Sequence, residues 1–207
     1  MRILTEHARE VLSRGAGLRL NLGCGGKPTP GMLNLDLRPL NGVDVEADLN
    51  QPLDLISDGS VVEVHSHHVF EHIDQLELLL AELMRVCAPD ARLLIRVPHF
   101  SNPFGYSDTT HRRFFGIYSF SYFAQNEYFP QRHGLPRYHD EIRFEIERVV
   151  VRFYRNTRFD RLILARWERL LNYSTRWLEF HEYRLAWLFP LREVEFHLRR
   201  PGNSTLP

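Results

Sequence analysis

The sequence predicts a single α/β domain over residues 1–207. Short apolar runs that end in glycine or an acidic residue are typical of buried parallel strands. One segment between two of these runs has apolar residues at helical spacing. In two segments near the end of the chain, apolar and polar residues alternate as in half-exposed strands. No repeat or linker interrupts these segments, and a chain of this length can bury one hydrophobic core.

The first half is expected to carry the parallel strands. An amphipathic helix is predicted over residues 1–17. Strands are predicted in the segments 18–26, 32–37, 43–48, 61–67 and 91–98. A helix is expected to begin at Ile73, because Leu76, Leu79 and Leu83 repeat at helical spacing. Pro89 and Asp90 are expected to stop it.

The second half is less regular. Among residues 100–129, 11 of 30 are Phe or Tyr, against 12% aromatic residues overall. Residues 142–154 and 192–200 alternate as strands do. Between them, residues 155–190 carry an amphipathic helical pattern and all three tryptophans, so one or two helices are expected there.

The composition excludes several classes of protein. Lys plus Arg and Asp plus Glu balance at 26 each, which gives no support to nucleic-acid binding. No apolar run approaches the roughly 18 residues that span a bilayer, and charges interrupt the N-terminal segment, which argues against a signal peptide. The two cysteines, Cys24 and Cys87, fit a reducing compartment. The expected location is the cytoplasm.

The predicted strand ends suggest a pocket for an adenosine-containing ligand. Gly23 and Gly25 follow the first strand, where a backbone can approach a bound molecule, and Asp36 and Asp48 end the next two strands. The carboxylate of Asp36 could accept hydrogen bonds from both ribose hydroxyls, and that of Asp48 could accept one from the exocyclic amine of an adenine. A dinucleotide site is the rival, but Pro28 breaks the G-x-G-x-x-G pattern, and too few residues follow for a normal crossover helix.

The segments LNLGCGGKPTPGMLNLDLRPLNGVDVEADLNQPL, HHVFEHI and LAELMRVCAPDARLLIRVP resemble class I S-adenosylmethionine-dependent methyltransferases. They resemble most the small bacterial enzymes of polysaccharide and natural-product pathways. The resemblance implies a Rossmann-like sheet with residues 18–98 as the cofactor-binding core and S-adenosylmethionine as the cofactor. The implied cofactor-binding residues are Gly23, Cys24, Gly25, Asp36, Asp48, Leu49 and His67.

The motif H-x-x-E-H at His68, Glu71 and His72 could also indicate a zinc hydrolase, which would need these residues on a long helix. Residues 61–67 instead read as a strand that runs directly into the motif. The motif is therefore interpreted as a strand end that faces the cofactor, with no metal expected.

Methyl transfer to a hydroxyl benefits from a general base, and histidine is the commonest choice. His111 is the first candidate, because Asp108 lies three residues before it and could orient its imidazole. The resemblance supports this choice, since related sugar-pathway enzymes often carry a similar Asp-x-x-His-x-Arg-Phe stretch. A role in tying the loop together is the alternative for His111, and His68 is the second candidate for the base.

Substrate contacts are expected in residues 99–140, interpreted as a lid. Arg113 could bind a phosphate or carboxylate of the substrate, and His99 is a further candidate contact. The aromatic side chains could stack on a sugar, or could simply bury an irregular segment. Both roles can hold at once.

The sequence departs from the implied fold in two places. The connections after the first three strands are too short for the usual helices, and a helical insertion, residues 155–190, precedes the last strand. The insertion is expected to cover apolar surface within the chain or across a homodimer. Peripheral membrane binding is the less favoured alternative, because acidic residues offset most of its arginines.

Together these features predict a methyltransferase of EC class 2.1.1 that methylates an oxygen of a sugar or small glycosylated metabolite, using a histidine base. The main alternative is a non-catalytic domain that binds an adenosine ligand. A zinc hydrolase is a weaker one. The identity of the acceptor does not follow from the sequence.

Overall fold

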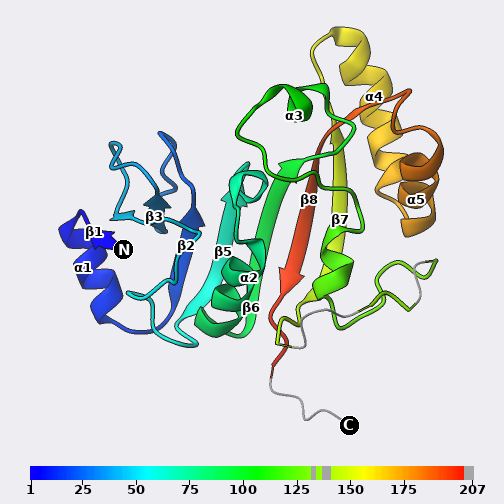
Figure 1. The fold of residues 1–207 in the computed structure, drawn as a ribbon. Coiled ribbons are helices and arrows are strands. Elements are labelled where there is room, and N and C mark those ends of the chain that lie inside the picture. Colours follow the sequence, from blue (N-terminus) through cyan, green and yellow to red (C-terminus); the bar gives the residue numbers. More distant parts are fainter. Residues whose placement is uncertain (132–133, 137–140, 203–207) are drawn as a thin grey trace.

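The computed structural model describes residues 1–131, 134–136 and 141–202. Within these ranges eight strands form one sheet in the order β1-β4-β3-β2-β5-β6-β8-β7 (Figure 1). The strands are β1 (Arg2–Ile3), β2 (Leu18–Leu22), β3 (Leu33–Asp36), β4 (Val45–Glu46), β5 (Val61–His67), β6 (Cys87–Pro98), β7 (Glu145–Phe153) and β8 (Leu191–Arg199). The predicted α/β fold is confirmed.

The sheet is parallel in its centre and antiparallel at its edges. The strands β4, β3, β2, β5 and β6 pair in parallel, whereas β8 runs antiparallel to both β6 and β7, and β1 antiparallel to β4. The carboxyl ends of the five parallel strands therefore meet at one edge, where open α/β sheets bind their ligands.

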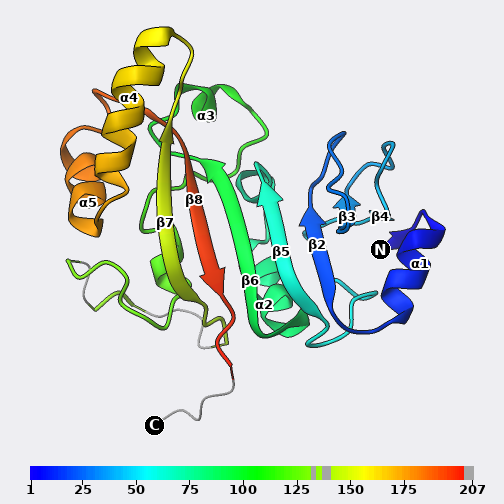
Figure 2. The same ribbon diagram turned by 180° about the vertical axis from the view of Figure 1, so that it is seen from behind.

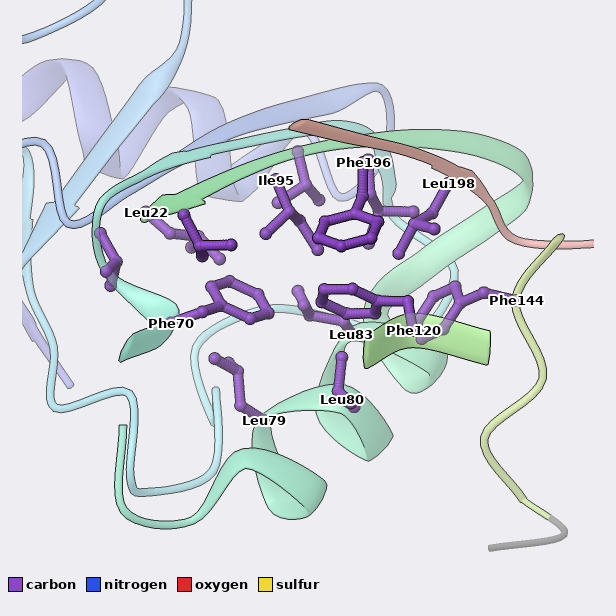
Figure 3. Close-up of a cluster of buried hydrophobic side chains, with 14 of the residues drawn as sticks. Leu22, Phe70, Leu79, Leu80, Leu83, Ile95, Phe120, Phe144, Phe196 and Leu198 are labelled. Atoms are coloured by element: carbon purple, nitrogen blue, oxygen red, sulfur yellow. The ribbon is translucent and has the colours of Figure 1, made fainter. Parts of the chain in front are cut away.

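The helix α2 (Leu76–Val86) covers one face of the sheet centre (Figure 1). Its leucines Leu79, Leu80 and Leu83 are at most 1% exposed. Leu79 and Leu80 lie below a layer that contains Phe70, Leu83 and Phe120, and this layer faces the strand residues of the sheet (Figure 3). The predicted leucine periodicity is thus the buried face of α2, and truncating one such leucine would cost roughly 2–5 kcal/mol.

On the opposite face of β5, β6 and β8, the part of the chain that the structure describes places no helix (Figure 2). Alternate positions there are polar and pair across strands, as in Arg19–Glu63 and Arg96–Glu195. His65 and His197 each contact a glutamate two residues away on their own strand. Charged side chains therefore coat this face of the sheet.

The connections between β2 and β3, β3 and β4, and β4 and β5 contain no helix among the described residues, as predicted. The short segments elsewhere are η1 (Phe70–His72), α3 (Pro103–Ser107) and η2 (Ser119–Phe123). No described helix combines the length and the apolar character needed to cross a membrane.

The predicted helical insertion forms α4 (Arg158–Leu171) and α5 (Thr175–Arg184) beside the edge strand β7 (Figure 1). Leu171 and Leu178 are at most 3% exposed. Asn172 accepts a hydrogen bond from the Val151 N–H at 2.8 Å and donates one to its carbonyl at 2.9 Å. The insertion thereby satisfies part of the open edge of β7, a position that otherwise invites pairing with another chain.

Several predicted boundaries are wrong, and α2 begins at Leu76 rather than at Ile73. Within residues 1–17, Arg2–Ile3 form a strand, and the helix α1 (Glu6–Ser13) starts after Thr5, whose side chain accepts from the Ala8 N–H at 3.1 Å. The helix α2 ends at Val86, so Pro89 and Asp90 lie inside β6. The pairing between β5 and β6 is irregular there, which lets a proline sit within the strand.

Candidate active site

A cavity of about 300 Å³ opens at the carboxyl ends of the parallel strands. It is lined by residues that follow β2, β3, β4 and β5: Gly23, Asp36, Leu37, Arg38, Ala47, Asp48, Leu49, Asn50, His68, Val69, His72 and Ile73. The size is at the lower end of the range for small-molecule sites. A larger apolar hollow of about 410 Å³ lies on α4, away from the strand ends.

Gly23 lets the backbone after β2 pass close to the end of β5. Its φ is +62°, and a Cβ atom there would lie 2.3 Å from Cγ2 of Val69. Any side chain would therefore both strain the backbone and collide with Val69. The tight turn that the sequence predicts at this position requires glycine for both reasons.

Asp36 holds the glycine turn in place. Its Oδ2 accepts a hydrogen bond from the Gly25 N–H at 2.7 Å, and its Oδ1 accepts from the Arg38 N–H at 3.0 Å. A carboxylate has about four acceptor positions, so Asp36 retains capacity for ligand hydroxyls at the cavity wall. Cys24 and Gly25 follow Gly23 directly in the sequence but do not line the cavity. Burial raises the pKa of the Cys24 thiol to about 11.

Asp48, Leu49 and Asn50 form the wall after β4. Asp48 Oδ1 accepts from the Asn50 N–H at 2.9 Å. The Asn50 side-chain oxygen accepts from the backbone N–H groups of Asp74 and Gln75, at 2.8 and 3.0 Å. Asn50 thus ties the cavity wall to the start of α2. The sequence analysis missed this residue, although asparagine is a common partner for unpaired N–H groups before a helix.

His68 occupies the left-handed region, with φ 57°, directly after β5. Its Nε2 lies 3.1 Å from Glu193 Oε2, and its Nδ1 lies 3.4 Å from Glu71 Oε1. Burial opposes the charged form, but the contacts with Glu193 and Glu71 prevail and raise the pKa of His68 to about 9. His68 is therefore protonated near neutral pH, and the expectation that it could serve as a base is not supported by its surroundings.

His111 lies on the loop after α3, with its side chain 10% exposed. Its Nδ1–H donates to the Gly105 carbonyl at 2.9 Å, which leaves the lone pair on Nε2. Asp108 Oδ2 is 3.7 Å from that Nε2, and Asp108 Oδ1 accepts from the Thr110 hydroxyl at 2.6 Å. The expected orienting role of Asp108 is thus performed by the Gly105 carbonyl. Contacts with Thr110 lower the pKa of Asp108.

The loop that carries His111 is attached to the segment after β5. The Arg112 N–H donates to the Glu71 carbonyl at 2.7 Å, and Arg112 Nε lies 3.1 Å from Asp74 Oδ1. Arg113 donates to the Asp74 carbonyl at 3.0 Å. The loop therefore places His111 beside His72, with ring centroids 4.8 Å apart.

Two further predicted site residues lie outside the cavity. His99 is 1% exposed and bonds Ser101 and Glu182 through its two ring nitrogens, each at 2.8 Å. It presents no surface to a substrate and links β6 to the insertion instead. His67 is half exposed and faces Glu193 at 3.8 Å, and burial beside the positive charge of His68 lowers its pKa.

The aromatic segment after β6 divides into buried and exposed rings. Phe115, Phe120 and Phe129 are 2% exposed and belong to the core. Phe104, Tyr106 and Phe114 are between 52% and 66% exposed. Tyr106 and Phe114 stack with centroids 4.4 Å apart. Some rings of this segment therefore pack in the core, and others form an exposed aromatic surface.

The chain was compared with known proteins. Residues 24–95 match the family described as "Methyltransferase domain". No curated protein matches the chain. Similar folds occur in a putative methyltransferase from Bacillus halodurans (TM-score 0.55, 14% identity, 96% of this chain and 100% of that one) and a SAM-dependent methyltransferase from Archaeoglobus fulgidus (TM-score 0.53, 16% identity, 93% and 94%).

A third similar structure is a chain from the complex between the Haloferax volcanii Trm112 methyltransferase activator and the putative methyltransferase (TM-score 0.54, 13% identity, 94% of this chain and 89% of that one). At these identities the structural matches establish the fold, which is the Rossmann-like sheet of class I methyltransferases. The matched methyltransferase domain, residues 24–95, gives the class of enzyme. The chain is an S-adenosylmethionine-dependent methyltransferase.

Proposed function

We propose that the enzyme methylates an oxygen atom of a sugar or small glycosylated metabolite, with His111 accepting the hydroxyl proton. The observation that carries this proposal is the tautomer of His111, whose Nδ1–H is bound to the Gly105 carbonyl, so that Nε2 keeps a lone pair. In the reaction, His111 Nε2 would accept the proton of the acceptor hydroxyl. S-adenosylmethionine, held at the cavity lined by Gly23, Asp36 and Asp48, would supply the methyl group to the oxygen and leave as the neutral thioether. Alignment of these atoms supplies most of the remaining catalysis.

The exposed rings of Phe104, Tyr106 and Phe114 support a substrate with a flat apolar face, as sugars have. We propose residues 99–140 as the segment that covers the substrate, although 132–133 and 137–140 lie outside the described residues. Both arginines contact Asp74, Arg112 at its carboxylate and Arg113 at its carbonyl. Arg112 is the more exposed of the two and is therefore the better candidate for an anionic group on the substrate. A place among bacterial polysaccharide or natural-product enzymes is part of this proposal.

Association through the insertion is a separate proposal. Trp187, Leu188 and Tyr183 are at least 60% exposed, and we propose that they bind a second copy of the chain. One similar structure contains a methyltransferase activator, which makes a different partner protein the alternative. Sedimentation of the purified wild type and of the variant Trp187→Ser tests the homodimer. Flotation with anionic vesicles tests membrane binding. A wild-type monomer across micromolar concentrations would rule out the homodimer.

The test of the proposed function starts with the cofactor. S-adenosylhomocysteine is titrated calorimetrically into the wild type, Asp36→Asn and Asp36→Ala. Asn can keep one acceptor for the Gly25 N–H, whereas Ala removes both, so we expect binding to weaken in the order wild type, Asn, Ala, with at least a tenfold loss, or about 1.4 kcal/mol, in Ala. Absence of binding to the wild type would overturn the proposed function.

If the cofactor product binds, labelled methyl transfer to sugar nucleotides and glycosides identifies the acceptor. NMR of the product distinguishes O-methylation from N- or C-methylation. Transfer to nitrogen or carbon alone would contradict the proposed acceptor atom.

A further inference from the structure

Glu71 is a buried carboxylate with unusual surroundings. It is 1% exposed, and neither of its carboxylate oxygens has a hydrogen-bond partner. The nearest ring nitrogens, His68 Nδ1 and His72 Nε2, lie 3.4 and 3.9 Å from Oε1. Leaving a buried charged group without hydrogen bonds is costly. His68, 3.4 Å from Oε1, compensates the charge of Glu71 in part but makes no hydrogen bond to it.

Two histidines near Glu71 carry their ring proton on Nδ1, so that Nε2 has a free lone pair in both. The Thr110 hydroxyl donates to Asp108 at 2.6 Å, so it must accept from His72 Nδ1–H, 2.9 Å away. His111 Nδ1–H is likewise held by the Gly105 carbonyl. In both rings an oxygen fixes the tautomer and the orientation, which is how metal-binding histidines are usually held.

One ligand atom from each of Glu71, His72 and His111 lies within 4.8 Å of the others. Ligand atoms at about 2.1 Å from a tetrahedral ion lie about 3.4 Å apart, so atoms as far as 4.8 Å apart would need to approach by up to about 1.4 Å. Two imidazoles and one carboxylate form a ligand set typical of divalent transition metals. We infer that Glu71, His72 and His111 form a binding site for such an ion, for example Zn²⁺, Mn²⁺ or Fe²⁺.

The surrounding charges distinguish this cluster from a second one. His67, His68 and Glu193 also come within 4.8 Å of one another. The arginines Arg96, Arg152 and Arg192 all approach Glu193, within 3.5 to 3.9 Å, and disfavour another cation there. Around Glu71, the arginines Arg112 and Arg113 are bound at Asp74 instead, and His68 approaches only one carboxylate oxygen.

The site would lie at the cofactor cavity, because His72 lines that cavity. This consequence rests on the proposed function. An acceptor hydroxyl bound to the ion would lose its proton to solvent water more readily, because a divalent cation lowers the pKa of a bound hydroxyl group. The lone pair of His111 cannot hold the ion and take the proton together. With the ion bound, the ion would activate the acceptor. In the metal-free enzyme, His111 Nε2 would keep the role of base proposed above. A bound ion would depart from the expectation that no metal is bound.

The test uses the full chain without a histidine tag, stripped with a chelator and titrated with CoCl₂. We expect one equivalent of Co²⁺ with visible absorption bands in the wild type. His72→Ala should bind at least 100-fold more weakly. Thr110→Val keeps the shape of the side chain but removes the acceptor for His72 Nδ1–H, and we expect a 10- to 100-fold loss. His7→Ala, on the exposed face of α1, is the matched control and should bind as the wild type does.

S-adenosylhomocysteine binding, measured on the same samples without metal, separates this inference from the proposed function. Cofactor-product binding without Co²⁺ uptake by the wild type would overturn the metal site and leave His111 as the base. Co²⁺ uptake without cofactor-product binding would support the metal site and overturn the proposed function. Equal Co²⁺ affinity in the wild type and His72→Ala would also overturn the assigned ligands.

Discussion

The cofactor side and the acceptor side of the active site are built in different ways. On the cofactor side, Gly23, Asp36 and Asp48 lie at the ends of neighbouring strands, and their positions follow from the parallel pairing of the sheet. On the acceptor side, His111 lies on an irregular loop that is held by a hydrogen bond to Gly105 and by several contacts with the segment after β5. The sheet constrains the first side, and side-chain contacts constrain the second.

This difference makes the two sides separable by mutation, and the largest effect is expected on the acceptor side. His111→Ala should lower kcat by about 10²- to 10⁴-fold, the usual contribution of a proton-transfer group. S-adenosylhomocysteine affinity should stay within about twofold, because His111 does not line the cavity. Single-turnover methyl transfer and calorimetry measure the two quantities, with His7→Ala as the control. Normal turnover in His111→Ala would remove this residue from the mechanism.

On the cofactor side, Gly23→Ala should destabilise the fold by about 2–4 kcal/mol, because it combines a collision with Val69 and a positive φ. Gly25→Ala is the matched control, since it has φ +53° but no atom within 4 Å of the added Cβ, and should cost only about 1–2 kcal/mol. Urea unfolding measures both variants. The double variant Gly23→Ala/Val69→Ala should recover part of the loss, and equal losses in both glycine variants would contradict the collision.

A smaller effect is expected where the two sides meet, at Glu193. Burial opposes its ionisation, but the hydrogen bond to His68 and the nearby arginines lower its pKa in the folded state. Its contribution to stability is therefore present above the unfolded pKa of about 4.3 and is lost as the pH falls through the folded value. Glu193→Gln should cost about 1–3 kcal/mol at pH 7 and less below pH 4.

Unfolding by urea between pH 3 and 7 measures this dependence. Glu195→Gln provides a comparison on the same strand, because burial and the contact with Arg96 act on its pKa in the same directions. A loss of stability in Glu193→Gln that is independent of pH would contradict the assigned charge effect.

The sequence predicted most of the strands and the cofactor side, because both depend on patterns that are local in the chain. The strand Val61–His67 was placed at its observed bounds, and the leucines of α2 revealed its buried face. The prediction failed at Pro89, because a proline looks like a helix stop when the irregular pairing that accommodates it inside β6 is not visible. Orientation by Asp108 failed because a backbone carbonyl, which carries no sequence signal, binds His111 instead.

The sequence by itself therefore determined the order of the strands along the chain, the glycine turn and the acidic residues that follow it. These features arise from side-chain periodicity and from backbone angles that only certain residues adopt. The tertiary structure alone decided that His68 meets Glu193, 125 residues away, and that His72 faces His111 beside a buried Glu71. Charge and proton positions depend on burial and on distant partners, and no local pattern encodes either of them.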